Sequence, residues 1–152
     1  MPDGSEYSYT VAANPDSAFI VPLFDNRDTV LVRQWRHAWD ESSWEVPAGT
    51  FDGDEDPLDC ARRELAEEAG LIAARYTSLG VVHGAAFITG RAHLFLAEGL
   101  TESARRPESY EQDMEVLRLP FAGALEAALD GTINHAGSIA ALARAARKVG
   151  VF

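Results

Sequence analysis

The sequence predicts an α/β (or α+β) fold, in which helices sandwich a mixed β-sheet. Three observations lead to this prediction. Short β-rich apolar runs alternate with turn signals in the first half of the chain, one strongly capped helix interrupts them, and two helical stretches close the sequence. The length of 152 residues and the hydrophobic content of 47% suit a chain with a real core, so a single domain over residues 1–152 is expected.

Local patterns place the expected elements. Asp25–Asp28 is typical of a hairpin connection between two strands, and Gly131 separates the two C-terminal helices. His37–Ser43 and Thr101–Gln112 are polar and predict loops. The predicted strands are Tyr7–Val11, Ala18–Phe24, Thr29–Trp35, Trp44–Val46, Tyr76–His83, Ala92–Leu100 and Met114–Leu119, and the predicted C-terminal helices are Phe121–Leu129 and Ser138–Lys148.

The first helix carries the clearest start and stop signals. Asp56 is a good N-cap, and Pro57 suits the first helical position, where its missing N–H costs nothing. The helix should run to about Ala69, because Gly70 is a natural C-cap. Its apolar stripe is expected on the side opposite its glutamates and consists of Leu58, Ala61, Leu65 and Ala69.

This helix also carries three carboxylates on one face. Glu64, Glu67 and Glu68 are spaced i, i+3 and i+4, so their charges repel unless a cation lies among them. Taken alone, an acidic helix face is more often solvated surface than a site. Clustered carboxylate oxygens nevertheless suit hard divalent cations, above all Mg2+ when a phosphate substrate supplies further ligands. The spacing therefore predicts a metal site for phosphate chemistry.

The surrounding 23 residues resemble the Nudix box of the Nudix hydrolases. The pattern is glycine, five residues, glutamate, seven residues and then Arg-Glu-aliphatic-any-Glu-Glu-any-Gly-aliphatic. Every fixed position is filled here, by Gly49, Glu55, Arg63, Glu64, Leu65, Glu67, Glu68, Gly70 and Leu71. Flanking segments 32–36, 44–49 and 131–142 resemble the branch of ADP-ribose and nucleoside-diphosphate-sugar pyrophosphatases. The likeness extends from about Ala18 to about Arg147.

This resemblance implies a Nudix-type α/β/α sandwich and Mg2+-dependent hydrolysis of phosphoanhydride bonds, with Mn2+ as a substitute. It assigns metal binding to Gly49, Glu64, Glu67 and Glu68. Catalysis is expected from Glu67 and Glu68, with a separate base from a later loop, where Glu111 is the first choice and Glu115 the second. Glu67 acting as the base itself is the alternative.

Several side chains near the box are candidates for other roles. Substrate contacts are expected from Arg33, Trp35, Arg36 and Glu45, because arginines pair with phosphates and an indole can stack on a base. Structural roles for the same residues remain open, including surface salt bridges for the arginines and core or dimer contacts for Trp35, Trp39 and Trp44. Arg63 is expected to orient the glutamates, together with Glu55. The four histidines show no metal-ligand spacing and are expected to be surface or satisfied polar residues, and Cys60 a buried thiol.

The expected reaction splits a nucleoside diphosphate linked to another moiety, of the ADP-ribose or nucleotide-sugar type, and releases a nucleoside monophosphate. Ala86 and Phe87 stand where the ADP-ribose branch tends to carry proline, and residues 84–90 lack the glutamate frequent there. These departures leave the group beyond the diphosphate open. The alternatives are a nucleoside triphosphate pyrophosphohydrolase and a non-catalytic nucleotide-sensing module.

Charge and composition exclude other classes of function. A net charge of −11 argues against binding nucleic acid or an anionic membrane. No apolar run approaches the ~20 residues that a membrane span needs. The single Cys60 and a start, Met1–Gly4, without a basic flank or apolar stretch predict a cytoplasmic protein. The expected partner is a small nucleotide substrate, and a homodimer is expected because related enzymes often build the pocket from two subunits.

Overall fold

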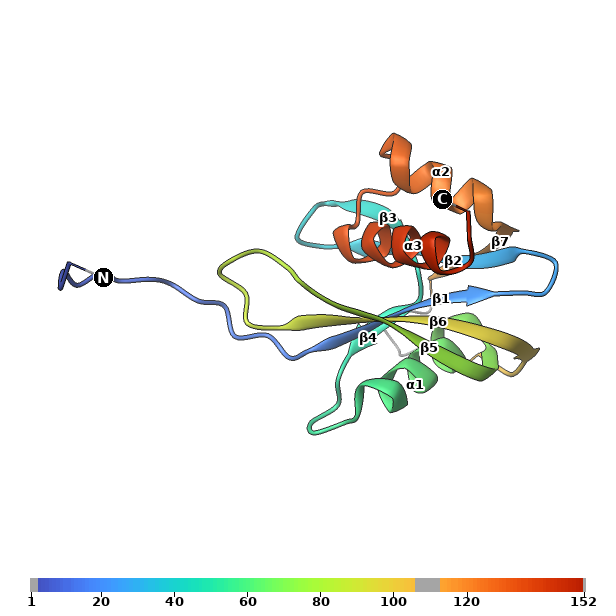
Figure 1. Cartoon of the computed structure of the whole chain (residues 1–152), viewed down its shortest axis with the longest axis horizontal. Coiled ribbons are helices and arrows are strands. Elements are labelled where there is room, and N and C mark those ends of the chain that lie inside the picture. Colours follow the sequence, from blue (N-terminus) through green and yellow to red (C-terminus); the bar gives the residue numbers. More distant parts are fainter. Residues whose placement is uncertain (1–2, 106–112, 152) are drawn as a thin grey trace.

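The computed structural model describes residues 3–105 and 113–151, and its strands and helices lie in layers (Figure 1). Helix α1 covers one side of the central strands, and α2 and α3 cover the other. In chain order, the elements are β1 (Ser17–Leu23), β2 (Asp28–Arg36), β3 (Glu41–Glu45), β4 (Ala48–Thr50), α1 (Pro57–Ala69), β5 (Leu71–His83), β6 (Arg91–Glu102), β7 (Glu115–Pro120), α2 (Phe121–Asp130) and α3 (Ala136–Lys148).

Two sheets form the central layer. The first has the strand order β4-β1-β6-β5. It is mixed, because β1 and β6 are parallel, whereas the pairs β1–β4 and β5–β6 are antiparallel. The second, with the order β3-β2-β7, is entirely antiparallel. The predicted mixed sheet between helices is confirmed, although the strands divide into two sheets.

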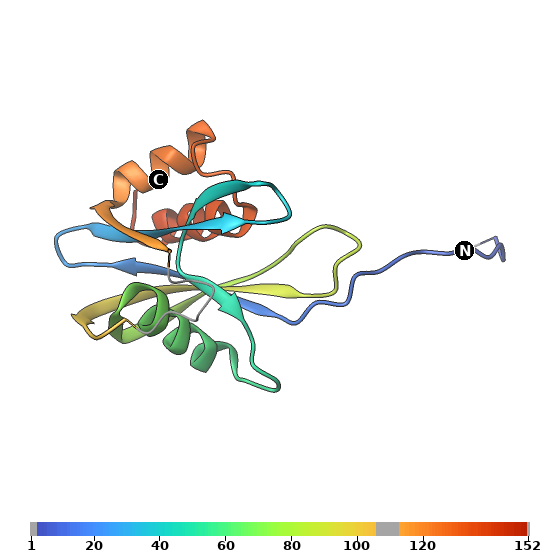
Figure 2. The same ribbon diagram turned by 180° about the vertical axis from the view of Figure 1, so that it is seen from behind.

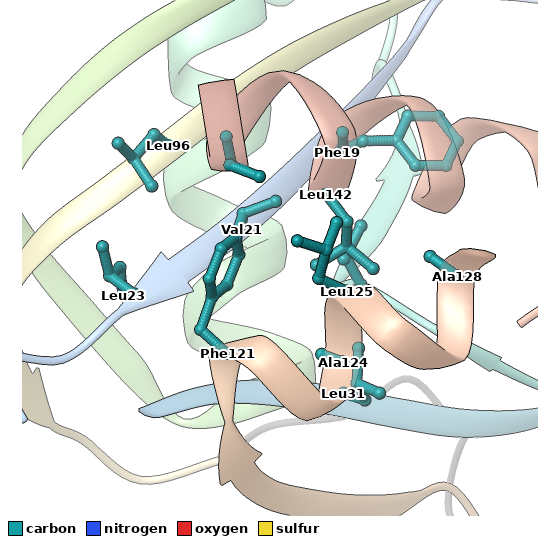
Figure 3. Close-up of a cluster of buried hydrophobic side chains, with 14 of the residues drawn as sticks. Phe19, Val21, Leu23, Leu31, Leu96, Phe121, Ala124, Leu125, Ala128 and Leu142 are labelled. Carbon is teal, nitrogen blue, oxygen red and sulfur yellow. The ribbon is translucent and has the colours of Figure 1, made fainter. Parts of the chain in front are cut away.

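Strand β1 supplies side chains to both layers of the core. Phe19 and Val21 pack with α2 and α3, whereas Ala18 and Ile20 pack with α1, as the two-residue period of a strand requires. Figure 3 shows the first of these clusters, where Val21, Phe121 and Leu142 come together from three elements. Each fully buried aliphatic or aromatic side chain of this kind contributes about 1.5–3 kcal/mol. The strand thereby fixes α1 and α3 on opposite faces.

The strands differ from the prediction at several places, and one of them is that β5 begins at Leu71 and not at Tyr76. Residues 7–11 alternate like a strand, but they form none in the described structure; their side chains are exposed, and the segment runs away from the body of the molecule (Figure 2). After this arm, an isolated bridge between Ala12 and Ile88 and hydrogen bonds between Asn14 and Thr89 connect the chain to the rest of the fold. Strand β3 begins at Glu41, inside the predicted loop, because it pairs with the long strand β2. Strand β4 was not predicted, since its three residues carry no β pattern.

The helices agree more closely with the sequence. Helix α1 has the predicted bounds, and α2 and α3 differ from the prediction by one or two residues at one end. In the described residues, none of the helices is long and apolar enough to cross a membrane.

Candidate metal and substrate site

Helix α1 is fixed at both ends by local chemistry. The carboxylate of Asp56 accepts a hydrogen bond from the backbone N–H of Leu58 at 2.9 Å, and Pro57 takes the first helical position. Gly70 ends the helix in the left-handed region, with φ of 65°. These caps confirm the predicted start and end of the helix.

Two of the three glutamates are buried rather than solvated. Glu64 and Glu68 are 6% and 0% exposed and lie on the same buried side of the helix as Ala61 and Leu65. The prediction that the apolar stripe lies opposite the glutamates is therefore wrong for these two residues. The carboxylate of Glu68 accepts a hydrogen bond of 2.9 Å from the backbone N–H of Ala48 in β4. Burial of a charge is costly unless it is compensated, so this face of α1 is not ordinary solvated surface.

Gly49 lets β4 approach the helix at this point. A Cβ atom at position 49 would overlap the carboxylate of Glu64, so an alanine there could not coexist with the present position of Glu64. The glycine therefore permits this position of the Glu64 carboxylate, whereas its backbone angles do not require glycine. Its carbonyl oxygen, an expected metal ligand, lies 3.6 Å from the Cys60 thiol.

The guanidinium of Arg63 lies among the carboxylates. It donates to Glu55 at 3.0 and 2.8 Å, to Glu64 at 2.5 Å, to Glu67 at 3.2 Å and to the carbonyl oxygen of Thr50 at 3.0 Å. The expected contacts of Arg63 with the glutamates and with Glu55 are present, and its role in orienting them stays a prediction. The hydrogen bonds from Arg63 also lower the pKa of Glu55 to about 2.

Cys60 lies in the same region as a structural residue. Its side chain is fully buried, and burial, with the nearby Glu64 and Glu55 carboxylates, raises its pKa to about 12. A thiol held protonated in this way is a poor nucleophile, which agrees with the predicted inert thiol.

The donor chemistry of the cluster suits a hard divalent cation. Oxygen ligands only are offered, and the space above Gly49 that a Cβ would fill holds the carboxylate of Glu64. Within residues 3–105 and 113–151, however, no three side chains of His, Cys, Asp and Glu are grouped closely enough to hold a metal ion. Here Glu64 and Glu67 are paired with Arg63, and Glu68 accepts from Ala48, so a metal site at Glu64, Glu67 and Glu68 remains a prediction.

The other predicted residues are divided between three places. Glu111 lies outside the described residues. Glu115, the second choice for a base, forms an exposed ion pair with Arg33 at 2.8 Å, between β7 and β2. Trp35 and Arg36 line a pocket, whereas Glu45 is fully buried beside it.

This pocket has a volume of about 470 Å³ and lies at β4, next to the carboxylate cluster. Residues from distant parts of the chain form it. Its aromatic and imidazole lining comes from Phe19, Trp35, His37, Trp39 and His135, and β4 contributes Ala48, Gly49 and Thr50. Three further hollows surround Phe24 at a different position and have none of these residues in their lining.

A buried polar network lies beside the pocket. Arg36 donates two hydrogen bonds to Glu45, and His135 Nδ1 lies 3.0 Å from Glu45 Oε2. Burial is the largest influence on the Glu45 carboxyl and opposes ionisation, but the hydrogen bonds from Arg36 and His135 together outweigh it and lower the pKa to about 2.

Sequence reasoning missed His135, Phe19 and Trp39 as pocket residues. His135 was expected to be a surface or satisfied polar residue, and it is indeed hydrogen-bonded, but it also lines the pocket. One local signal was available: Gly137, where a Cβ would lie 2.5 Å from the Phe19 ring, allows the start of α3 to pack this closely. Nothing in the sequence pairs that glycine with Phe19.

Known proteins resemble both the sequence and the fold. A family model described as the NUDIX domain matches residues 14–140. The ADP-ribose pyrophosphatase of Mycobacterium tuberculosis is 35% identical over 144 residues, covering 92% of this chain and 69% of that protein. The GDP-mannose pyrophosphatase of Cronobacter sakazakii is 34% identical over 131 residues, covering 76% of this chain and 64% of that protein.

A solved structure supports the fold independently of close sequence similarity. The crystal structure of an ADP compounds hydrolase superposes with a TM-score of 0.80 at 22% identity, covering 90% of this chain and 74% of that one. The family model alone spans most of the chain, and the complete box runs from β4 through the capped helix α1 to the start of β5. The chain therefore belongs to the Nudix family of hydrolases.

Proposed function

We propose that this chain hydrolyses the diphosphate bond of a nucleoside diphosphate linked to another moiety, of the ADP-ribose or nucleotide-sugar type. The products are a nucleoside monophosphate and the phosphorylated remainder. Mg2+, or Mn2+ in its place, is the proposed cofactor, held by Glu64, Glu67, Glu68 and the backbone carbonyl of Gly49.

One observation carries this proposal: two buried glutamates one turn apart face a strand that also borders a pocket. Glu64 and Glu68 lie against β4, and the same three residues of β4 line the cavity of about 470 Å³. Relatives named ADP-ribose pyrophosphatase and GDP-mannose pyrophosphatase support the substrate class. A diphosphate at β4 would have carboxylates on one side and space for a linked ring on the other.

Each residue of the cluster has a distinct proposed task. A divalent cation, when bound, neutralises charge on the diphosphate oxygens and lowers the pKa of the attacking water. Glu64 and Glu68, held in place by β4, anchor the cation, while Arg63 keeps Glu64 and Glu67 oriented. Glu67 is the most exposed of the three glutamates, at 29%, and is therefore the one best placed to take a proton from water. Glu111 is the other candidate for this base.

Substrate contacts are proposed mainly for the pocket. Trp35 lies on its lining with an exposed indole, suited to contact a flat ring. Arg36 lines the same cavity, although its guanidinium is bonded to Glu45. Arg33 lies outside this lining and is paired with Glu115, so a phosphate contact by Arg33 requires that exposed pair to open.

A product assay tests the proposal. Purified protein is incubated with Mg2+ and, in turn, ADP-ribose, several nucleotide sugars, dinucleoside polyphosphates and nucleoside triphosphates, with EDTA controls. Release of a monophosphate from a linked diphosphate, abolished in Glu68→Gln, supports it. Glu126→Gln is the matched control, because it removes one exposed carboxylate from a helix away from the site. Pyrophosphate from triphosphates would replace the proposal with the alternative reaction, and binding without any product would indicate a sensing module.

Three further expectations belong with this proposal. A single domain over residues 1–152, a cytoplasmic location and a homodimer remain predictions. Sedimentation of the purified protein tests the homodimer.

A further inference from the structure

A buried carboxylate and an imidazole form a pair beside the pocket. Glu45, in β3, has no exposed surface, and His135 immediately precedes α3. The Nδ1 atom of His135 lies 3.0 Å from Glu45 Oε2 and 3.0 Å from the hydroxyl of Ser138. An ionised carboxylate can only accept hydrogen bonds, so Nδ1 carries the proton and donates it toward Glu45.

The opposite edge of the ring is left for the pocket. His135 lines the cavity, and within the described part of the chain its Nε2 atom makes no hydrogen bond. The ring contacts two aromatic side chains, with centroid distances of 5.4 Å to Phe19 and 5.6 Å to Trp39. When Nδ1 carries the proton of a neutral ring, Nε2 is an acceptor with a fixed direction.

The charge of the pocket indicates what it can accept. Among the described residues of the lining, Arg36 is the one Arg or Lys side chain, next to the imidazoles of His37 and His135, and both of its bonds to Glu45 compensate its charge. A phosphate site normally offers uncompensated cations or several converging N–H groups. The indoles of Trp35 and Trp39 are instead 55% and 46% exposed, which suits stacking on an uncharged ring.

We propose that His135 is a specificity-determining residue, whose Nε2 accepts a hydrogen bond from a hydroxyl or amino group on the uncharged ring at one end of the substrate. Trp35 and Trp39 contact the face of that ring, which is the sugar or the nucleobase of the linked diphosphate. Glu45 does not touch the substrate; it is a positioning residue that fixes the tautomer and direction of His135. This inference rests on the proposed function for the identity of the substrate.

Two substitutions of His135 separate a contact to substrate from a structural role. Asparagine places an amide near the Nδ1 position and keeps the bond to Glu45, whereas glutamine extends its amide toward the Nε2 position. His135→Asn should raise KM about tenfold with kcat changed less than about twofold, because one neutral hydrogen bond is lost. In His135→Gln, KM should stay close to the wild-type value. Melting temperatures of both variants verify that the fold is kept.

Either of two kinetic results would overturn the inference. An unchanged KM in His135→Asn would mean that Nε2 contacts nothing in the substrate. An equal rise in KM for both variants, with equal loss of melting temperature, would mean that His135 only supports the structure.

A binding measurement tests the same contact without turnover. Trp35 and Trp39 report ligand in the pocket, so quenching of tryptophan fluorescence is followed in Glu68→Gln protein with AMP, GMP, ribose 5-phosphate and mannose 1-phosphate. One class of half-substrate should quench, and its Kd should weaken about tenfold when His135→Asn is added. A response to nucleotides identifies the base, and a response to sugar phosphates identifies the sugar. Equal quenching by pyrophosphate alone would contradict an uncharged-ring site.

The two proposals can fail separately. Hydrolysis of a linked diphosphate with a KM that is indifferent to His135 leaves the reaction standing and removes this inference. Binding that depends on His135, without hydrolysis of any member of the panel, removes the reaction and keeps the ring site.

Discussion

The two groups of residues that meet at β4 are built in opposite ways. The carboxylate cluster comes from one helix and the loop before it, carries several charges, and is held by a single guanidinium, Arg63. The pocket collects side chains from β1, β2, the β2–β3 connection and the residue before α3, and its one Arg–Glu pair is internally neutral. Local spacing can encode the first arrangement, whereas only the complete fold assembles the second. The difference suggests separate tasks, ion chemistry on one side and recognition of a ring on the other.

The largest effect is expected from Gly49→Ala, which acts on the contact between β4 and the cluster. The new Cβ would overlap the Glu64 carboxylate, so Glu64 must move. A displacement of about 1 Å in a catalytic group costs on the order of a hundredfold in rate, and kcat should fall by that amount. Gly123→Ala is the control, because its Cβ meets nothing within 4 Å and its backbone is helical. Wild-type kcat in Gly49→Ala would refute the close approach.

On the pocket side, Glu45→Gln should lower the free energy of unfolding by about 2–4 kcal/mol at pH 7. The substitution leaves the partly exposed Arg36 and His135 without their anionic partner, and removing one member of a buried pair is strongly destabilising. Urea unfolding measures the effect.

The same variant carries a pH dependence with a definite sign. The folded-state pKa of Glu45 is about 2, below its unfolded value of 4.5. Its contribution to stability is therefore complete above about pH 4.5 and is lost as the pH falls toward 2. The difference in the free energy of unfolding between wild type and Glu45→Gln should therefore become smaller as the pH falls from about 4.5 to 2. A difference that stays constant from pH 7 to pH 3 would show that the charge of Glu45 is not what stabilises the fold.

Returning to the cluster, Arg63→Gln should destabilise the protein by about 1–3 kcal/mol, because Glu55, Glu64 and Glu67 lose a shared partner that is only partly exposed. Arg62→Gln is the matched control: its exposed pair with Asp59 is worth about 0.5 kcal/mol or less. Added Mg2+ should raise the melting temperature of Arg63→Gln more than that of wild type, since the carboxylates are less compensated. Equal shifts would argue against a metal site at these glutamates.

The smallest effect is expected from Trp35→Ala. The indole is 55% exposed, so the melting temperature should hardly change, while loss of stacking should raise KM several-fold, corresponding to about 0.5–1.5 kcal/mol. Ile72→Ala is the control, because Ile72 in β5 has the same exposure and does not line the pocket. If both variants leave KM unchanged, Trp35 is not part of the ring site.

These contrasts explain what could be predicted from the sequence. Asp56, Pro57 and Gly70 define α1 because capping involves neighbours only a few residues apart. The contacts of Arg63 with the glutamates followed from the same spacing. The burial of Glu64 and Glu68 did not follow, because it depends on β4, a three-residue strand without a β pattern.

The pocket could not be predicted from the sequence, because its residues come together only in the folded chain. Glu45 stands in a Trp-Glu-Val segment that gives no sign of a buried charge, and its compensation comes from Arg36 and from His135, which is 90 positions away in the chain. Residues 7–11 show the reverse error: their alternation is typical of a strand, but no neighbouring strand pairs with them in the described structure. Pairing and burial are properties of the assembled chain.

The buried thiol of Cys60 can be used to measure local opening of the fold. The thiol is enclosed between α1 and β4, and its raised pKa of about 12 keeps it protonated at neutral pH. A thiol-specific reagent can therefore modify it only during excursions in which the helix leaves the strand. The modification rate, compared with that of an unfolded thiol, converts into the free energy of that excursion. Comparing the modification rates with and without Mg2+ would show by how much a bound cation raises the free energy of this opening.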